Sequence, residues 1–141
     1  MDHYQAVLLV PTVGKNFYDL TSRIKEKVRN SGITTGLCTV FVRHTSASLV
    51  IQENADPDVL HDLSSFFSQL VPEDRLRYRH GTEGVDDMPA HIRSALTNTS
   101  EQIPITDGRL ALGTWQGIYL WEHRQLNHNR EVIVHINGTT H

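Results

Sequence analysis

The sequence predicts an α+β fold, in which about three helices pack on a largely antiparallel sheet in one compact domain. Three observations support this fold class. Strand-like apolar runs outnumber helical patterns, the strands gather in the C-terminal third, and helices and strands do not alternate as a parallel βαβ sheet requires. A chain of 141 residues can bury a core of its own, so we expect residues 1–141 to form a single domain.

The first half of the chain is expected to begin with a strand and a helix. The apolar run at residues 4–11 predicts the strand. The helix is predicted by apolar residues at helical spacing, with an end at Asn30-Ser31-Gly32; these residues are Phe17, Leu20, Ile24 and Val28. Two further strands are expected at residues 35–44 and 47–53, which are rich in β-branched and apolar residues.

The clearest helix follows Asp56. The Asp56 carboxylate can accept hydrogen bonds from the free N–H groups of the first turn, and Pro57 suits the first helical position. Pro72 ends the helix. Its apolar stripe consists of Val59, Leu60, Leu63, Phe66, Phe67 and Leu70.

A polar loop at residues 75–84 separates this helix from a short one that is started by Asp87 and Pro89. The apolar side of the short helix is marked by Met88, Ile92, Ala95 and Leu96. Strands are then expected at residues 101–105, 109–112, 117–122 and 131–137. A hairpin turn at Asp107-Gly108 is expected to join the first two of them.

Composition excludes several classes of function. The formal net charge of −3 and the pI of about 6.3 give no long-range attraction to nucleic acid or to an anionic membrane. A single cysteine, Cys38, excludes an intrachain disulfide and a cysteine-only zinc site. The apolar stretch at residues 6–10 is too short for a signal peptide or a membrane span. We therefore expect a cytoplasmic protein that has no nucleic-acid or membrane partner and acts on a small molecule.

His44 is the first of nine histidines that suggests chemistry. It closes an expected strand, and alternation would place it on the same face as Cys38, Val40 and Val42. The small residues that follow it would let a ligand approach the backbone. Two interpretations stay open: His44 is a metal ligand at a strand end, or it is a core histidine that is satisfied by a backbone carbonyl.

A second group of polar residues lies at positions 79–91, which contain two histidines and three carboxylates. His44, His80 and His91 could together hold one divalent metal ion, because a catalytic zinc ion is usually held by three protein ligands with one position open. Glu83 would then act as a general base or acid on a bound water. The alternative is a solvated acidic loop, and neither HExxH nor paired CxxC is present.

Further candidates lie at the ends of expected strands. Glu122 shares a strand face with Ile118 and Leu120, where a carboxylate is costly unless it is paired. It would either sit in the pocket, with a perturbed pKa, or reach water at the strand end. Asn54 follows a strand, and Thr114 and Gln116 belong to a polar turn; these three could bind substrate or simply shape the connections.

Three segments, in order along the chain, resemble the signatures of one family. The first consists of residues 44–49 and 53–57, the second of residues 80–84 and 86–92, and the third of residues 108–109, 113–120 and 122. Together with their flanks they are similar to the YjbQ-type proteins, the family labelled secondary thiamine-phosphate synthases, over almost the whole chain.

The resemblance implies more than the residues do. It implies an α+β homotrimer with sites near subunit contacts, and one divalent metal ion, expected to be zinc, held by the histidines that match His44, His80 and His91. The family label implies a weak joining of a hydroxymethylpyrimidine diphosphate to a thiazole phosphate. Trp121 departs from the pattern, because many members have cysteine there, so we expect a different pocket shape.

Three functions are compatible with these observations. The first is a metal-dependent transfer like that of the thiamine-phosphate synthases, in which Arg93 would bind the diphosphate substrate. The second is metal-dependent hydrolysis of a small metabolite, with Glu83 or Glu122 moving the proton. The third is a non-catalytic trimeric protein that binds a metal or a metabolite. The residues favour an enzyme, and they suit hydrolysis somewhat better than transfer.

Overall fold

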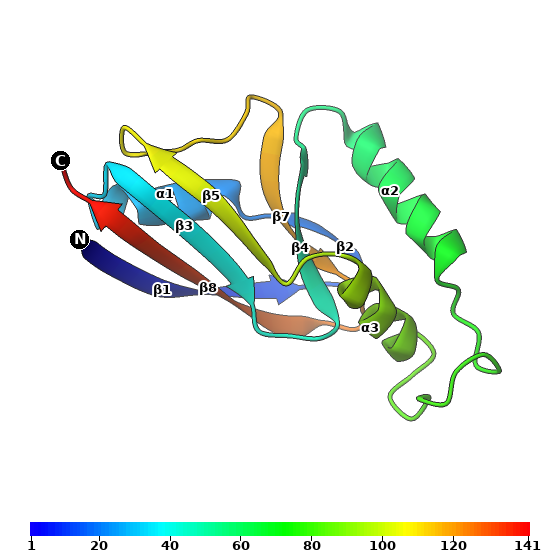
Figure 1. Ribbon diagram of the computed structural model, residues 1–141. Helices are drawn as coiled ribbons and strands as arrows, with labels where there is room; N and C mark the ends of the chain where they lie inside the picture. The colour runs from blue at the N-terminus through cyan, green and yellow to red at the C-terminus, as the bar shows by residue number, and fades with distance from the viewer.

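The computed structural model describes residues 1–141 and confirms the α+β class (Figure 1). Its strands are β1 (Asp2–Thr12), β2 (Asn16–Asp19), β3 (Thr35–Val42), β4 (Ala47–Glu53), β5 (Ser100–Thr106), β6 (Arg109–Leu110), β7 (Gln116–Glu122) and β8 (His128–Thr139). Its helices are α1 (Thr21–Ser31), α2 (Pro57–Leu70) and α3 (Asp87–Leu96). Figure 1 shows α1 behind the strands, whereas α2 and α3 lie together at one side of them.

The strands form two antiparallel sheets. The larger sheet has the order β1-β8-β3-β5-β6, and the smaller one has the order β2-β7-β4. The longest pairing joins β1 to β8, from Asp2 opposite Gly138 to Thr12 opposite His128, so the two ends of the chain lie side by side. Because β8 and β5 occupy both edges of β3, the next strand, β4, pairs with β7 in the smaller sheet.

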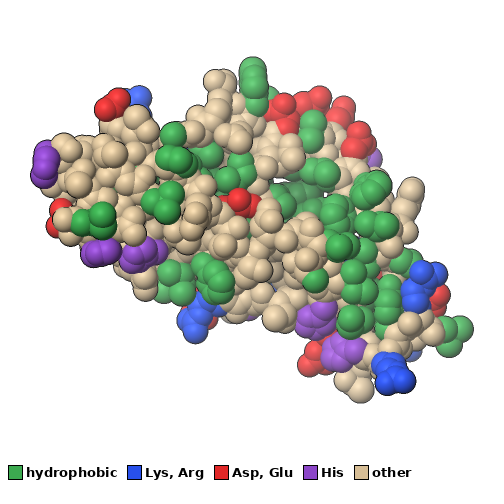
Figure 2. Space-filling model, viewed as in Figure 1, with side chains coloured by type: hydrophobic (Ala, Val, Ile, Leu, Met, Phe, Trp, Pro, Cys, Tyr) green, Lys and Arg blue, Asp and Glu red, His purple; other side chains and the backbone are tan.

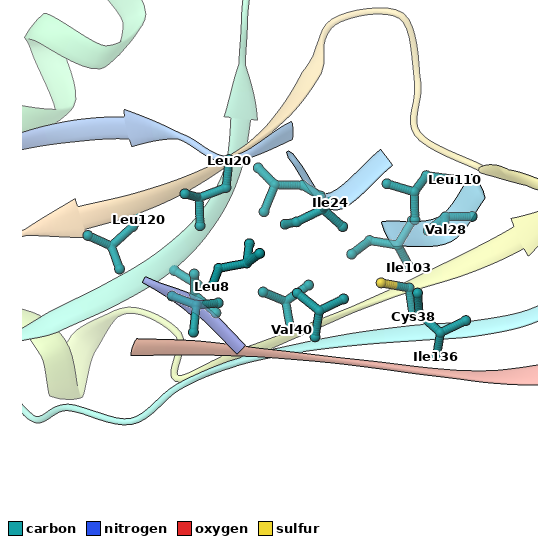
Figure 3. Packing of buried hydrophobic residues seen from close by; sticks show 14 of the residues in the cluster. Leu8, Leu20, Ile24, Val28, Cys38, Val40, Ile103, Leu110, Leu120 and Ile136 are labelled. Carbon is teal, nitrogen blue, oxygen red and sulfur yellow. The ribbon is translucent and has the colours of Figure 1, made fainter. Parts of the chain in front are cut away.

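The hydrophobic core lies between the larger sheet, α1 and the smaller sheet (Figure 3). Alternate residues of β3 and β8 point into it, as the period of two predicts. The buried residues of these two strands include Cys38, Val40, Val42, Val132, Val134 and Ile136. The helix α1 adds Ile24 and Val28, which Figure 3 shows beside Ile103 and Leu110. Removal of this apolar surface from water is the main source of stability.

The start of α1 differs from the prediction. Phe17 was expected inside the helix, but it lies in β2, where it pairs with Trp121 and stacks on the Trp121 ring at a centroid separation of 4.4 Å. The helix begins at Thr21, whose N–H donates to the Asp19 carboxylate. Phe17 fits the helical spacing only by coincidence, because the aromatic contact with β7 outweighs local periodicity.

The helix α2 begins where the sequence predicts, but it is not buried. Asp56 is the N-cap and accepts a hydrogen bond from the Asp58 N–H at 2.9 Å. No residue of α2 is buried, and Phe66 and Leu70 on its apolar stripe are more than half exposed. A 14-residue amphipathic helix therefore contacts the rest of the chain along only part of its apolar side.

The helix α3 packs more closely, because Asp87, Ala90 and Arg93 on its inner side are buried. It lies against β4, and an isolated bridge between Leu49 and Asn98 fixes the chain that follows it. This places the polar residues of the first turn of α3 next to the loop that precedes β4. No helix of the chain combines the length and the apolar character that crossing a membrane requires.

Candidate metal centre

Four side chains that could bind a metal ion converge at the start of α3: His80, Glu83, Asp87 and His91. One ligand atom from each lies within 4.8 Å of all the others. Asp87 and His91 are one helical turn apart on α3, so both point the same way. His80 and Glu83 come from the preceding loop. The structure thus joins two of the three predicted histidines with Glu83, and it adds Asp87.

Asp87 lies at the centre of this group. Its Oδ2 atom is 2.5 Å from His80 Nε2 and 3.1 Å from His91 Nε2, whereas His80 Nε2 lies 3.6 Å from Glu83 Oε2. The Asp87 side chain is only 2% exposed. Burial by itself would raise the pKa of its carboxyl, but the hydrogen bond with His80 and the charge of Arg124 hold the pKa below its usual value. Asp87 is therefore an anion that faces two imidazole rings.

The tautomer of His91 is fixed by the backbone. Its Nδ1 atom lies 3.0 Å from the carbonyl oxygen of Thr45. A carbonyl oxygen can only accept, so Nδ1 carries the proton and donates it. In a neutral ring the Nε2 lone pair then faces Asp87 Oδ2. Either a second proton or a metal cation must lie between these two atoms, and an Nδ1–H bonded to a carbonyl is the usual support of a metal-binding histidine.

Arg124, just after β7, holds the carboxylate side of the group. Its NH1 group donates to Asp87 Oδ1 at 2.5 Å, its Nε to Asp86 Oδ2 at 3.2 Å, and its NH2 to the Glu83 carbonyl at 2.8 Å. The Arg124 guanidinium thus links the loop that contains Glu83 to the first turn of α3. The sequence analysis assigned no role to Arg124, and its separation of 37 residues from Asp87 leaves no local signal.

The group opens to solvent at the end of an apolar surface. The side chains of His80, Glu83 and His91 are 41%, 62% and 32% exposed, so a ligand can reach all three. Figure 2 shows hydrophobic side chains gathered over α2 and α3, with histidine and acidic side chains at one end of that area. A substrate bound at the histidines would therefore have an apolar surface beside it.

His44 is not part of this group. The strand β3 ends at Val42, and the His44 Nε2 atom accepts a hydrogen bond from the Glu131 N–H of β8 at 2.8 Å. Burial, together with the charge of Arg130, lowers the pKa of His44. In this conformation the half-buried ring accepts from a backbone N–H, whereas the second interpretation drawn from the sequence was a core histidine bonded to a backbone carbonyl.

Glu122 is fully buried and paired. Its Oε1 atom accepts hydrogen bonds from Thr12 Oγ1 at 2.6 Å and from Arg130 Nε at 2.7 Å, and its Oε2 accepts from the Arg124 N–H at 3.1 Å. Burial would raise the pKa of Glu122, but the hydrogen bonds from Arg130 and Thr12 lower it overall. A carboxylate on an apolar strand face is costly unless it is paired. The partner of Glu122 is Arg130, which lies eight residues further along the chain.

His123 and Arg93 lie on the other side of β7, between the smaller sheet and α3. His123 Nε2 is 2.9 Å from Ser48 Oγ, while His123 Nδ1 and Arg93 Nε are buried without a partner in the chain. Burial, followed by the charge of Arg93, lowers the pKa of His123 to about 3. Arg93 donates to the Val71 carbonyl at 3.2 Å and is only 6% exposed, so it does not reach the open side of the histidine group.

The residues predicted to bind substrate contact one another, but they lie far from the histidine group; they are Asn54, Thr114 and Gln116. Asn54 Nδ2 donates to the carbonyls of Thr114 and Gln116 at 3.3 and 3.4 Å. They lie beyond Glu53, at the far end of β4 from Thr45, and seven strand residues span roughly 23 Å. Within one chain these residues cannot contact a small molecule that is bound at His91.

Comparison with known protein families shows which family includes this chain. The family model described as UPF0047 protein YjbQ-like matches residues 6–139. The chain therefore belongs to the YjbQ-like UPF0047 family. It is 69% identical over 135 residues to a UPF0047 protein of Synechocystis sp., covering 96% of this chain and 92% of the relative. It is 40% identical over 136 residues to the UPF0047 protein YjbQ of Escherichia coli O157:H7, covering 96% and 98%.

Solved structures share the fold of this YjbQ-like chain. A YbjQ-like protein of unknown function from Sulfolobus solfataricus has a TM-score of 0.90 at 26% identity, covering 98% of this chain and 99% of the other. A YjbQ/UPF0047 family protein from Clostridium acetobutylicum has a TM-score of 0.83 at 36% identity, covering 95% and 99%. The family and the fold are established by these matches, whereas none of the names assigns a reaction.

Proposed function

We propose that this YjbQ-like protein is a divalent-metal-dependent enzyme that hydrolyses a small metabolite. The observation that carries the proposal is the convergence of His80 and His91, through their Nε2 atoms, on Asp87 Oδ2. A neutral His80 can donate its Nε2–H to this carboxylate, but the Nε2 lone pair of His91 faces the same oxygen. A metal ion at that point would satisfy both rings at neutral pH without an extra proton.

The donor set fits such an ion. Zinc takes imidazole nitrogen and carboxylate oxygen at about 2.0–2.2 Å, so ligand atoms around one tetrahedral ion lie roughly 3.4 Å apart. The three neighbouring atom pairs are separated by 2.5 to 3.6 Å. Zinc is therefore the expected metal, with His80, Asp87 and His91 as ligands and Glu83 at the exposed side. A divalent ion held there would supply Lewis-acid chemistry and lower the pKa of a water ligand to about 7.

Other residues of the chain would position the metal ligands and accept the proton. Thr45 and Arg124 hold the His91 ring and the Asp87 carboxylate in place before any substrate binds. Glu83, the most exposed carboxylate of the group, is placed to accept a proton from an attacking water.

Transfer of a pyrimidine diphosphate to a thiazole phosphate, which the resemblance suggests, has less support from the geometry. A diphosphate leaving group calls for free cationic side chains. Arg93 is buried, and Arg124 is occupied by Asp86, Asp87 and the Glu83 carbonyl. We therefore propose hydrolysis first, and transfer as the second reaction to assay.

We also propose that the protein assembles as a homotrimer, as the resemblance implies. The support comes from α2, whose apolar stripe finds no buried position within one chain. Neighbouring copies that cover this helix would bury Phe66 and Leu70. They could also bring the Asn54, Thr114 and Gln116 end of one chain towards the histidine group of the next, where these residues would bind substrate.

Metal content tests the proposal directly. Elemental analysis of the purified protein is expected to give about one zinc or similar ion per chain, and His80→Ala, His91→Ala and Asp87→Asn are each expected to lose it. His61→Ala is the matched control, because His61 is exposed on α2 and its one side-chain hydrogen bond is with the neighbouring Asp62. Full metal content in all three variants would reject the site. Loss in His44→Ala alone would place the metal at the strand end instead.

Activity assays distinguish hydrolysis, transfer and a non-catalytic binding function. The metal-loaded protein is assayed on phosphate monoesters, carboxylic esters and lactones, and then on the pyrimidine and thiazole substrates. Turnover of an ester that is lost in Glu83→Gln, while the metal is retained, supports hydrolysis. A stoichiometric metal without turnover on any of these substrates would favour the non-catalytic binding protein.

A further inference from the structure

A second concave site lies between α1 and the hairpin of β5 and β6. Its cavity has a volume of about 430 Å³. It is lined by Lys25, Val28, Arg29, Asp107, Gly108, Arg109 and Leu110. Figure 1 shows α1 and the tip of this hairpin at the end of β5 that lies away from α3. The cavity is thus separate from the histidine group, and it does not depend on the proposed function.

The lining of this cavity carries an excess of positive charge. Three of its residues, Lys25, Arg29 and Arg109, are cationic, and Asp107 alone is acidic. None of the three cations is among the ion pairs of the chain, which join other residues. The chain as a whole has more acidic than basic residues, 16 against 13, so carboxylates are not scarce. Three cations and one carboxylate thus give this hollow a formal charge of +2, whereas the chain as a whole has a formal charge of −3.

Helix electrostatics account for only part of this arrangement. Arg29 lies in the last turn of α1, where a cation interacts favourably with the helix dipole. Lys25 lies one turn earlier, and like charges four residues apart destabilise a helix slightly. Arg109 faces both from the hairpin. An anion placed between them would remove this repulsion and would gain charge-assisted hydrogen bonds.

The walls suit a small organic molecule as well as an anion. Val28 and Leu110, which are 2% and 8% exposed, form the apolar part of the lining and belong to the core cluster. A volume of about 430 Å³ lies within the range of small-molecule sites, roughly 300–1,000 Å³. Guanidinium groups match the oxygens of both carboxylate and phosphate in a fork geometry, and a phosphate dianion also balances the charge of three cations and one carboxylate.

We propose that this cavity binds the phosphate group of a small phosphorylated metabolite, with Lys25, Arg29 and Arg109 around the dianion. Free inorganic phosphate and a phosphate monoester share this chemistry. The monoester is not expected to bind much more tightly than phosphate, because Val28 and Leu110 are only 2% and 8% exposed and offer little apolar surface to its organic part.

Calorimetric titration of the intact protein in EDTA tests the proposal, since the chelator prevents a probe from binding through a metal ion. Ribose 5-phosphate, inorganic phosphate and ribose are the three probes. Inorganic phosphate and ribose 5-phosphate are both expected to bind, with Kd values within about tenfold of each other, and ribose is not expected to bind. Arg109→Gln and Lys25→Gln are each expected to weaken binding about tenfold, as the loss of one charge-assisted contact predicts.

The matched control is Lys27→Gln, which removes the same charge from α1 but does not line the cavity. Thermal unfolding of each variant shows that the fold is retained; all three positions lie on the surface of the chain. Equal affinities for all variants, or an effect of Lys27→Gln as large as that of Arg109→Gln, would overturn the proposal. So would the absence of binding by either phosphate probe at 50 mM salt, where screening is weak.

NMR spectroscopy locates the bound probe. Amide resonances of Gly108 and Arg109 are expected to shift on titration with ribose 5-phosphate, whereas the resonances of His80 and His91 stay in place. Shifts at the histidine group without shifts at Gly108 would assign the phosphate to the other site and reject this one. The outcome is independent of metal content, so it does not stand or fall with the proposed enzymatic function.

Discussion

Arg124 donates to Oδ1 of Asp87 at 2.5 Å, while the other oxygen of the same carboxylate faces His80 and His91. The guanidinium therefore fixes the plane of the carboxylate on which both imidazoles converge. Because Arg124 also holds Asp86 and the Glu83 carbonyl, it joins β7 to the loop and to α3 at a single point.

Replacement of this arginine should weaken metal binding without unfolding the protein. Arg124→Gln is expected to lower the zinc affinity by roughly 10- to 100-fold, the usual cost of losing a partner of a metal ligand. Competition with a chromophoric chelator measures the affinity, and circular dichroism verifies the fold. Arg77→Gln is the control, since Arg77 is exposed and its ion-pair partner, Asp74 at 4.0 Å, is not a member of the group. An unchanged affinity in Arg124→Gln would show that Asp87 needs no such support.

The buried pair of Glu122 and Arg130 should be far more sensitive to the loss of one partner than to the loss of both. Glu122→Ala leaves the Arg130 guanidinium buried without its carboxylate, and roughly 3–5 kcal/mol of unfolding free energy is expected to be lost. The double variant Glu122→Leu, Arg130→Met is expected to lose less than Glu122→Ala alone, because it leaves no buried charge unpaired. Urea denaturation of the wild type and both variants measures the difference.

An exposed pair gives the comparison. Arg43 and Glu131 are about half exposed and 3.6 Å apart, so Glu131→Gln is expected to cost at most about 1 kcal/mol. If Glu122→Ala proved no more costly than Glu131→Gln, the buried network would not stabilise the fold.

His123 should make the protein less stable as the pH falls from 7 to 5. Burial and the nearby charge of Arg93 lower its pKa to about 3 in the folded chain, against about 6.5 in the unfolded chain. The unfolded state therefore binds more protons than the folded state below pH 6.5. The stability that comes from the neutral ring is fully present above that pH and is lost progressively as the pH drops towards 3. Roughly 2 kcal/mol is expected to disappear between pH 7 and pH 5.

The measurement compares the wild type with His123→Gln in urea at pH 7 and pH 5, both in EDTA. Gln keeps a polar group near Ser48 but does not titrate, so its stability should fall by about 2 kcal/mol less than that of the wild type. Glu122 and Asp86 have lowered pKa values and stay ionised in this range, so they do not interfere. His61→Gln, on the exposed side of α2, should behave like the wild type. Parallel curves for the wild type and His123→Gln would contradict the assignment.

Local chemistry made part of this structure predictable. The bounds of β4 and the Asp56 cap of α2 agree with the sequence analysis, because alternation and capping are decided within a few residues. The hairpin at Asp107-Gly108 also forms, with Asp107 and Gly108 both at positive φ. The α+β class follows from these elements together.

Long-range packing decided what the sequence could not show. The helical spacing of Phe17 is outweighed by its stacking on Trp121, more than a hundred residues away in the chain. The role of Asp87 in the candidate metal centre depends on its contacts with Arg124 and His80, and only the fold brings these residues together. His44 lies at the expected strand end, yet the direction of its ring is set by the Glu131 N–H of β8. Residue types thus identified His80, Glu83 and His91, but not Asp87 or Arg124, which only the fold brings to them.

The apolar stripe of α2 should control the oligomeric state. Phe66 is 60% exposed on a helix that buries no residue, so a charge at this position costs little in one chain but would disrupt a contact between copies. The wild type is expected to sediment as three chains of 16.0 kDa each, about 48 kDa, and Phe66→Glu as a single chain. Ser68→Glu, which adds the same charge to the same helix at an exposed polar position, is the control and should remain assembled. A wild type that sediments as one chain at 100 µM would reject the trimer, and an assembled Phe66→Glu would move the interface away from α2.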